Sequence, residues 1–294
     1  MQSVILSNDL KIYAPNEFEA RALYRQIFTE KTYSSHGIEI SDGDCIFDIG
    51  ANIGLYSIFL TQSHRDLKIF AFEPIPQTFS ILEKNVARDQ NGSQVKLFNF
   101  GLSRKSGSGQ FEFDRFASFS ATMRPAEVSA CVRKDAGMYD WARAAISDLR
   151  KVSFLSDEFS DRLMAALPKP VVGKMVVIVI YALLLLTLLR KKLFLKKIKC
   201  ELRTISEVMS EHNIEGVALM KIDAEGSELE VIEGIADEDW PKIRQCVVEV
   251  HDFDGRVEKM RSIFEGRGYQ TVVDQEPWGV HKLLNLFMVY AVRS

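Results

Sequence analysis

The ten residues 45–54, Cys-Ile-Phe-Asp-Ile-Gly-Ala-Asn-Ile-Gly, restrict the fold of this chain more than any other stretch. A short apolar run ends in the carboxylate of Asp48, and a turn containing Gly50 and Gly54 follows at once. Residues 55–60 then have the length and composition to begin a helix. A buried strand, a glycine turn and a helix N-terminus form the usual nucleotide site of an open α/β sheet. Because glycine allows positive φ and close backbone approach, this stretch predicts an α/β fold that binds a nucleotide-like ligand here.

The rest of the chain supplies a complete sheet around that first strand. Six further strands are predicted, at residues 67–72, 95–100, 216–223, 245–251, 270–273 and 286–292. Helices are predicted between them, at residues 76–88, 228–233 and 256–264 and after the capping-box pattern of Thr204 and Glu207. The last two strands lie close together in the sequence, which favours an antiparallel pair. The pattern predicts a Rossmann-like, doubly wound fold with a seven-stranded mixed sheet.

Residues 1–43 are expected to form an N-terminal extension of this sheet. Residues 4–6 and 10–13 are separated by Ser-Asn-Asp and predict a small hairpin. Asn16 is a suitable N-cap for a helix that continues to Phe28. Residues 41–44, Ser-Asp-Gly-Asp, then predict a turn into the first core strand.

Composition excludes some classes of function. The net charge of −3 offers no general argument for binding nucleic acid. The four cysteines, at positions 45, 131, 200 and 246, form no CxxC motif, and two lie in predicted strands as small buried side chains. We therefore expect a reducing, cytoplasmic compartment and no structural zinc. The first residues lack a basic region followed by a long apolar stretch, which predicts no secretory signal.

The charges around the glycine turn indicate which nucleotide-like ligand binds there. The turn reads D-x-G-x-N-x-G, with Asp48 and Asn52, rather than the G-x-G-x-x-G of dinucleotide enzymes. A carboxylate would repel a pyrophosphate, but it suits S-adenosylmethionine, which carries a sulfonium and an ammonium group and no phosphate. Glu73 ends the second strand 25 residues after Asp48, where a carboxylate can accept hydrogen bonds from both ribose hydroxyls. The alternatives are that Asp48 is only a turn carboxylate and that Glu73 only caps the turn at Pro74.

Four motifs stand out in the sequence: FDIGANIG (47–54), FEPIP (72–76), LMKIDAEGSELEVIEGI (219–235) and DWPKIRQCVVEVHDFDGR (239–256). With these motifs the chain resembles the FkbM family of S-adenosylmethionine-dependent methyltransferases. The resemblance covers residues 1 to about 125 and 200–294, and it is closest to members acting in polyketide or peptide natural-product pathways. It implies the class I methyltransferase fold and methyl transfer from S-adenosylmethionine to a hydroxyl oxygen.

The resemblance also assigns site residues. It places contacts to the donor at the first-turn residues and at the end of the second strand: Asp48, Gly50, Asn52, Gly54 and Glu73. It places Asp223, at the end of the fourth strand, against either the donor or the acceptor. Asn99 or Phe100 is a further candidate contact near the adenine.

Methyl transfer to an aliphatic hydroxyl needs alignment of the reacting atoms and a base that removes the hydroxyl proton. His251 is the candidate base, because it ends the fifth strand at the edge where ligands bind. Either Glu225 or Glu249 is expected to orient its imidazole, and Lys221 has the strand parity to pair with Asp223. The alternative is that His251 is only a polar residue at a strand end. No set of oxygen ligands near Asp223 suggests a metal site.

Residues 116–199 interrupt the α/β pattern and differ from it in charge. A short extra strand is predicted at residues 110–114, just before this segment. Helices are predicted within the segment at residues 136–149 and 157–167. Residues 162–200 contain nine Lys or Arg and no Asp or Glu, and residues 175–189 carry no charge. As a helix, residues 175–189 would span about 22 Å, short of the ~30 Å hydrocarbon core of a membrane. A single crossing would also separate the two halves of the sheet.

Three interpretations of this segment remain open. Residues 168–199 would bind an anionic membrane surface at the inner face of the membrane, cover the acceptor pocket as a lid, or form a core or homodimer helix. The nine basic residues favour the membrane surface.

The chain is therefore expected to have three parts: an N-terminal extension (1–43), a methyltransferase domain (44–115 and 200–294) and a helical, partly apolar insertion (116–199). The expected activity is O-methylation of a small-molecule hydroxyl on a polyketide, peptide or lipid-like acceptor. The alternatives are an NAD-dependent oxidoreductase and a non-catalytic, membrane-associated binding module.

Overall fold

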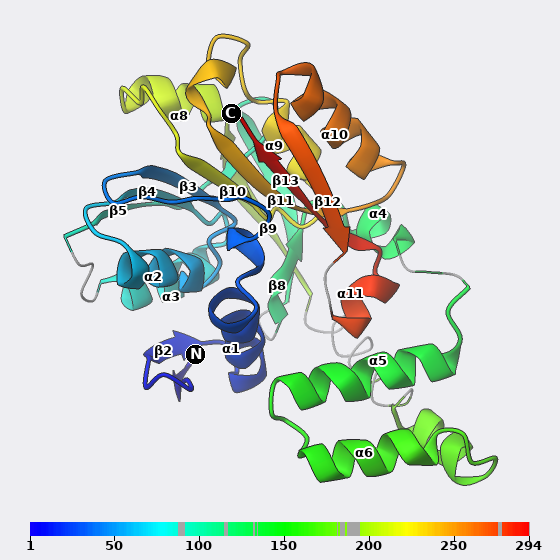
Figure 1. Cartoon of the computed structure of the whole chain (residues 1–294). Coiled ribbons are helices and arrows are strands. Elements are labelled where there is room, and N and C mark those ends of the chain that lie inside the picture. The colour runs from blue at the N-terminus through cyan, green and yellow to red at the C-terminus, as the bar shows by residue number, and fades with distance from the viewer. Residues whose placement is uncertain are drawn as a thin grey trace.

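A seven-stranded mixed sheet forms the centre of the computed structural model (Figure 1). The structure describes residues 1–293 except 88–91, 115, 116, 132, 134, 181, 183–185, 187–194, 276 and 277. The strands run in the order β12-β13-β11-β10-β3-β4-β5, and β13 runs in the opposite direction to the other six strands. Their bounds are β3 (Cys45–Ile49), β4 (Lys68–Phe72), β5 (Gln94–Phe98), β10 (Leu219–Ile222), β11 (Gln245–His251), β12 (Gln270–Gln275) and β13 (Leu286–Val292). The predicted sheet and its antiparallel final pair are confirmed.

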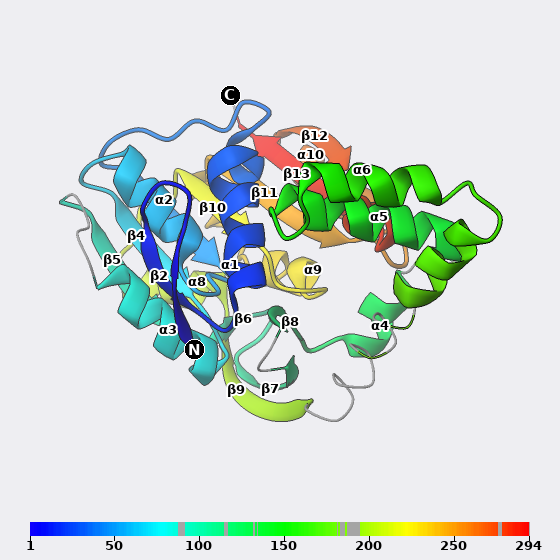
Figure 2. The same ribbon diagram turned by 90° about the horizontal axis from the view of Figure 1, so that it is seen from below.

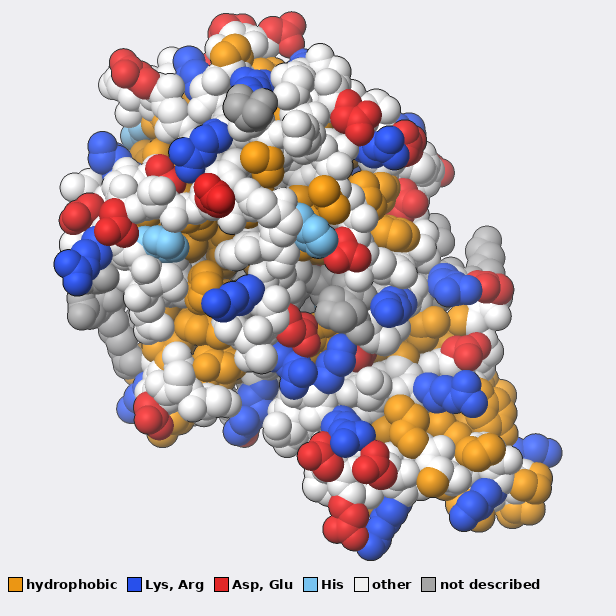
Figure 3. All heavy atoms as spheres, in the orientation of Figure 1, with side chains coloured by type: hydrophobic (Ala, Val, Ile, Leu, Met, Phe, Trp, Pro, Cys, Tyr) orange, Lys and Arg blue, Asp and Glu red, His pale blue; other side chains and the backbone are white. Residues whose placement is uncertain are grey.

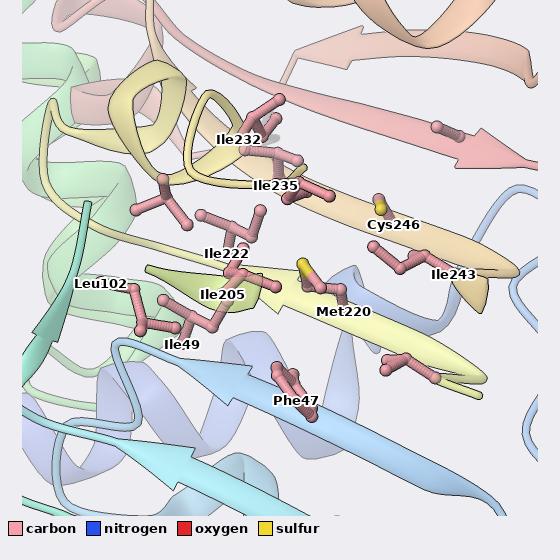
Figure 4. Close-up of a cluster of buried hydrophobic side chains, with 14 of the residues drawn as sticks. Phe47, Ile49, Leu102, Ile205, Met220, Ile222, Ile232, Ile235, Ile243 and Cys246 are labelled. Atoms are coloured by element: carbon pink, nitrogen blue, oxygen red, sulfur yellow. The ribbon is translucent and has the colours of Figure 1, made fainter. Parts of the chain in front are cut away.

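Helices cover both faces of this sheet, which is why its central strands, β3, β4, β10 and β11, are largely buried on both sides. One face packs against α2 (Leu55–Ser63) and α3 (Pro76–Val86), through buried residues such as Ile46 and Leu82. The other packs against α8 (Ile205–Glu211), α9 (Glu228–Ile232) and α10 (Arg256–Gly266), through a cluster that includes Phe47 and Met220 (Figure 4). Both hydrogen bonds of the capping box predicted at the start of α8 are present.

The N-terminal extension folds as predicted in its first half. The hairpin consists of β1 (Gln2–Ile5) and β2 (Lys11–Ala14). The Asn16 side chain accepts a hydrogen bond from the Glu19 amide (2.8 Å) and caps α1 (Glu17–Tyr24). Beyond α1 the chain continues as a π-helical turn (Arg25–Thr29) and a 3₁₀ turn (Thr32–Ser34), and a further 3₁₀ turn, Trp240–Lys242, precedes β11.

A second, four-stranded sheet lies beside the first, and it includes part of the segment predicted to be helical. Its order is β6-β9-β7-β8, with β6 (Gly101–Leu102), β7 (Gly107–Asp114), β8 (Ala117–Thr122) and β9 (Lys196–Arg203). The extra strand predicted at 110–114 is present, but the prediction of an all-helical 116–199 missed β8 and the start of β9. Ile198, Cys200 and Leu202 alternate with polar residues and pack in the core of this sheet. The lysines of β9 therefore lie on a strand rather than on a basic helix.

The remainder of the insertion is helical in the residues that the structure describes. It contains α4 (Pro125–Ala130), α5 (Met138–Lys151), α6 (Asp157–Ala166) and helical residues 172–180. The two helices predicted at 136–149 and 157–167 are thus confirmed. Ala142, Ile146, Leu167 and Val177 form a small core of their own between them. Figures 1 and 2 show α5 and α6 side by side, projecting from the body of the molecule.

The helical part also carries exposed apolar side chains. Figure 3 shows hydrophobic side chains gathered on the projecting part, and Val171, Met175, Ile178 and Val179 are exposed there. Within the described residues, the structure has no helix with the length and apolar character needed to cross a membrane. Arg190, Lys191 and Lys192 lie outside the described residues. The membrane-surface, lid and dimer interpretations all stay predictions.

The insertion is attached at the carboxyl edge of the parallel strands. Both oxygens of Asp148, on α5, accept backbone hydrogen bonds from Gly279 (3.0 Å) and Val280 (2.8 Å) of α11 (Gly279–Leu283). The chain leaves α11 into β13, whose first residue, Leu286, pairs with His251 at the end of β11. Because ligands of open α/β folds bind at this edge, α5 is fixed near the expected site.

Candidate active site

The glycine turn between β3 and α2 brings the backbone of two strand ends together. Gly50 has a φ of +75°, and a Cβ atom added there would lie 1.8 Å from the carbonyl oxygen of Asp223. Asn52 (φ +49°) and Gly54 (φ +88°) also have left-handed backbone conformations. The turn therefore requires glycine at position 50, both for its conformation and for the space that a side chain would fill.

Asp48 lies beneath this turn and is completely buried. The Ser57 hydroxyl donates to its Oδ2 (2.7 Å), and Lys221 Nζ lies 3.3 Å from its Oδ1. The carboxylate thus contacts protein groups and is closed off from solvent. In this structure Asp48 supports the turn from below.

Lys221 connects Asp48 to the open part of the site. Its Nζ donates to the carbonyl oxygen of Gly50 (2.8 Å) and lies 3.7 Å from Asp223 Oδ2, so the predicted Lys221–Asp223 pair is present. Burial lowers the pKa of Lys221, but the negative charges of Asp48, Asp223 and Glu249 offset it and leave the pKa raised. The shorter contact with Asp48 was not predicted. Lys221 therefore stays a cation that holds two carboxylates and the turn together.

Glu73 bridges the glycine turn and the loop after β4. Its Oε2 accepts from the amide of Asn52 (3.1 Å) and its Oε1 from the amide of Ile75 (2.8 Å). Burial raises the pKa of Glu73 to about 7, although both of these hydrogen bonds act to lower it. Asn99 is exposed, and its Nδ2 donates to the carbonyl oxygens of Glu73 (2.8 Å) and Pro74 (3.2 Å). Asn99 thus fixes the backbone that positions Glu73.

Asp223 and Glu225 are the half-open carboxylates of the site. Their side chains are 23% and 22% exposed, whereas that of His251 is 4% exposed. Tyr33 Oη lies 3.2 Å from Asp223 Oδ2 and 3.3 Å from Glu249 Oε2, and Gln26 Nε2 donates to the same Glu249 oxygen (3.1 Å). Burial raises the pKa of Asp223, and Lys221 opposes this rise.

His251 lies between two carboxylates. Its Nε2 is 3.5 Å from Glu225 Oε2, and its Nδ1 is 3.8 Å from Glu228 Oε1. Burial lowers the pKa of His251, but Glu228, Glu249 and Asp223 offset this and leave the pKa above its usual value. Of the two residues expected to orient the imidazole, the structure brings Glu225 into contact with the ring, while Glu249 is bound by Tyr33 and Gln26.

Three residues of the site were missed from the sequence: Glu228, Tyr33 and Gln26. An acidic residue at the start of a helix, such as Glu228, reads as an ordinary first-turn charge. Tyr33 and Gln26 come from the N-terminal extension, and neither shows a periodicity that points to β10 or β11. Their contacts depend on how the extension packs over the sheet.

Negative charge dominates the whole site. Six carboxylates, those of Asp48, Glu73, Asp223, Glu225, Glu228 and Glu249, surround one lysine and one histidine. Such a site suits a cationic ligand and opposes a pyrophosphate. In the part of the chain that the structure describes, no group of three His, Cys, Asp or Glu is arranged to hold a metal ion.

Comparison with known proteins identifies the family. The chain is 30% identical over 277 residues to 31-O-demethyl-FK506 methyltransferase FkbM of Streptomyces tacrolimicus, an alignment that covers 94% of this chain and 92% of that protein. The chain belongs to the FkbM methyltransferase family. The model of the methyltransferase FkbM domain matches residues 187–271. Methyltransferase sdnD of Sordaria araneosa is 26% identical to this FkbM-family chain, over 94% of the chain and 92% of sdnD.

A further relative is a small part of a much longer protein. The chain is 26% identical, over 93% of its length, to a stretch of AMB antimetabolite synthetase AmbE of Pseudomonas aeruginosa that makes up 12% of that protein.

Membership of the FkbM family settles the class of the enzyme. The seven-stranded mixed sheet is the class I methyltransferase fold. Family and fold together imply S-adenosylmethionine as the methyl donor, so the enzyme is an S-adenosylmethionine-dependent methyltransferase rather than an NAD-dependent oxidoreductase.

Proposed function

We propose that this FkbM-family enzyme transfers the methyl group of S-adenosylmethionine to a hydroxyl oxygen of a small-molecule acceptor of polyketide, peptide or lipid-like character. One observation carries the proposal: Asp223, Glu225 and His251 meet at the carboxyl edge of the sheet, directly beside the glycine turn. The name of the Streptomyces tacrolimicus relative supports the oxygen as the atom methylated, since it describes a 31-O-demethyl compound.

The residues at the glycine turn fit the donor. Because Gly50 has no Cβ, the turn packs directly against the Asp223 carbonyl, and Gly54 begins α2 without a capping side chain. When bound, S-adenosylmethionine supplies a methyl group on a cationic sulfur. We propose that Glu73 accepts from the ribose hydroxyls and that Asn52 and Gly54 contact the donor through the turn. Asn99 contacts the adenine side of the donor while it holds the Glu73 backbone.

The remaining carboxylates serve the ammonium group of the donor and the turn itself. Asp223 is the more open carboxylate and accepts from the ammonium group, because Asp48 is fully buried. Asp48 and Lys221 act from beneath, holding the Gly50 carbonyl and the Asp223 side chain in place. Removing either partner would leave a buried charge without its counter-charge.

The acceptor hydroxyl must lose its proton while its oxygen attacks the methyl carbon. In the Glu225–His251 pair, the Glu225 side chain is the more exposed and is therefore the one placed to contact the acceptor. His251, whose pKa is raised, takes the proton from the acceptor directly or through the Glu225 carboxylate. Holding the acceptor in line with the reacting bond supplies the other large part of the acceleration.

Titration calorimetry with S-adenosylmethionine tests the donor half of this proposal. Wild type should bind S-adenosylmethionine and not NAD, and Glu73→Gln should weaken binding by about tenfold or more through the lost charge-assisted hydrogen bonds. Glu83→Gln is the matched control, because Glu83 lies exposed on α3 away from the site. Equal affinities for the two variants would contradict the role of Glu73.

Transfer of a labelled methyl group into extracted small molecules, followed by mass spectrometry, tests the acceptor half. The expected product carries the label as a methyl ether. Label on nitrogen or carbon would overturn the hydroxyl assignment. Donor binding without any transfer would favour the alternative of a non-catalytic binding module.

A further inference from the structure

Glu228 is a buried carboxylate that the steps proposed above leave without a role. It is the first residue of α9 and is completely buried. Its Oε1 accepts from the Gly226 amide (2.6 Å), but its Oε2 has no hydrogen-bond partner among the described residues. Burial of a carboxylate oxygen without a partner is unfavourable, so this side chain is a candidate for an interaction that forms in another state of the site.

The imidazole of His251 lies close to this carboxylate. Its Nδ1 also has no hydrogen-bond partner in the described part of the chain, and it lies 3.8 Å from Glu228 Oε1. A shift of less than 1 Å would give Nδ1 a hydrogen bond of ordinary length to the Glu228 carboxylate. Catalytic hydrogen bonds are often long before substrates bind and shorten in the complex.

We propose that Glu228 is a positioning residue: its carboxylate accepts from Nδ1–H of His251 and so directs the unprotonated Nε2 towards Glu225 and the acceptor. This rests on the proposed function, and it assigns the tautomer that the function requires. The geometry follows from β11, which ends at His251, and from the Gly226 turn, which holds Glu228 Oε1.

The proton and electron balance is complete with the groups present. A lone pair of the acceptor oxygen forms the new carbon–oxygen bond, and the carbon–sulfur bond breaks to leave a neutral thioether. The hydroxyl proton passes to Nε2 of His251, directly or through Glu225, and Glu228 balances the imidazolium charge. The proton then leaves to solvent through the half-open Glu225.

Other charges also face the ring, and they must be separated from the effect of Glu228. Asp223 extends from the end of β10, Glu225 from the loop before α9 and Glu249 from β11 itself, and Lys221 partly neutralises Asp223. Glu228 is the one among them whose contact is with Nδ1. Its removal should therefore change the tautomer as well as the pKa.

Glu228→Gln isolates this effect. The amide oxygen of glutamine can still accept from the Gly226 amide, so the loop keeps its bond while the charge is removed. Glu233→Gln is the matched control, because Glu233 follows the same helix and pairs with Arg104 on the surface. Thermal unfolding of both variants checks that they are folded.

NMR of protein labelled with ¹⁵N at its five histidines measures the ring directly. The spectrum of His251→Gln identifies the signals of His251. Wild type should show the Nδ1–H tautomer and a pKa above that of a free histidine. Glu228→Gln should lower this pKa by about one unit or more and lower kcat by about tenfold or more, with little change in KM for the donor. The ascending limb of the pH–rate profile should move to lower pH with it.

The outcomes separate this inference from the proposed function. An unchanged His251 pKa in Glu228→Gln, or the Nε2–H tautomer in wild type, would overturn the inference while donor binding and methyl transfer still stand. Failure of wild type to bind the donor would refute the proposed function. The NMR titration of His251 would still report on the Glu228–His251 pair. If Glu228→Gln does not fold, the tautomer and pKa of His251 in wild type decide.

Discussion

Substitution of Gly50 by alanine is expected to damage both stability and donor binding. At a φ of +75° an alanine is strained by about 1–2 kcal/mol relative to glycine. The new methyl group would also lie 1.8 Å from the Asp223 carbonyl oxygen, a backbone atom that cannot rotate away. Forcing an extra group into a packed site costs about 1–3 kcal/mol. The free energy of unfolding should therefore fall by about 2–5 kcal/mol.

The same overlap would displace the end of β10, which carries Asp223. Asp223 is the proposed partner of the donor's ammonium group, so affinity for S-adenosylmethionine should fall by more than tenfold, a loss of over about 1.4 kcal/mol. Chemical denaturation measures the first effect and titration calorimetry the second.

Gly43→Ala is the matched control, because Gly43 also has a positive φ (+84°) but an added Cβ there would meet no atom within 4 Å. It should lose only the backbone strain of about 1–2 kcal/mol and keep its affinity for the donor. Equal losses of stability in Gly50→Ala and Gly43→Ala would refute the argument that a side chain at position 50 collides with the Asp223 backbone.

Four further predictions concern charge and surface. Lys221→Met should lower the free energy of unfolding by about 3–5 kcal/mol, because it leaves the fully buried Asp48 without its counter-charge, and adding Asp48→Asn should restore part of it in denaturant titrations. The pKa of Glu73 is raised to about 7, so between about pH 4.5 and 7 the folded protein binds a proton that the unfolded chain releases. The free energy of unfolding of the ligand-free protein should therefore fall by on the order of 3 kcal/mol as the pH rises through this range. Glu73→Gln should abolish this fall. Donor affinity should rise over the same range as Glu73 ionises, since only the carboxylate accepts from both ribose hydroxyls. If the insertion binds an anionic membrane surface, the intact enzyme should float with anionic liposomes and the exposed-site variant Ile178→Asp/Val179→Asp should not; identical flotation of the two would refute that interpretation.

The core of the fold could be predicted because its signals are local. The fifth and last strands, residues 245–251 and 286–292, match the predicted bounds, since each is an apolar run delimited by polar or turn residues. The helix start at Thr204 was readable because the two partners of a capping box lie three residues apart.

The electrostatic arrangement of the site was harder to predict because it depends on sheet order. Asp48 and Lys221 are distant in sequence, and they pair because β3 and β10 are adjacent with these two residues in register. Strand parity predicted that Lys221 shares a side with Asp223, but parity within one strand cannot reveal the neighbouring strand. The burial of Asp48, and hence its supporting role, follows from that pairing.

The start of β9 was missed for a different reason. Its lysines follow a long apolar run and an earlier basic cluster, so the composition of the segment concealed the alternation of Ile198, Cys200 and Leu202. Non-local pairing with β7 then decides in favour of a strand.

That second sheet has an evolutionary consequence. Thr122, at the end of β8, and Lys197, near the start of β9, both pair with Glu112, one on each side of β7. Since neighbouring strands are about 4.8 Å apart, the chain departs from and returns to the sheet at points only about 10 Å apart. A lineage could therefore exchange, shorten or lengthen everything between these points at little entropic cost and inherit the donor-binding sheet unchanged.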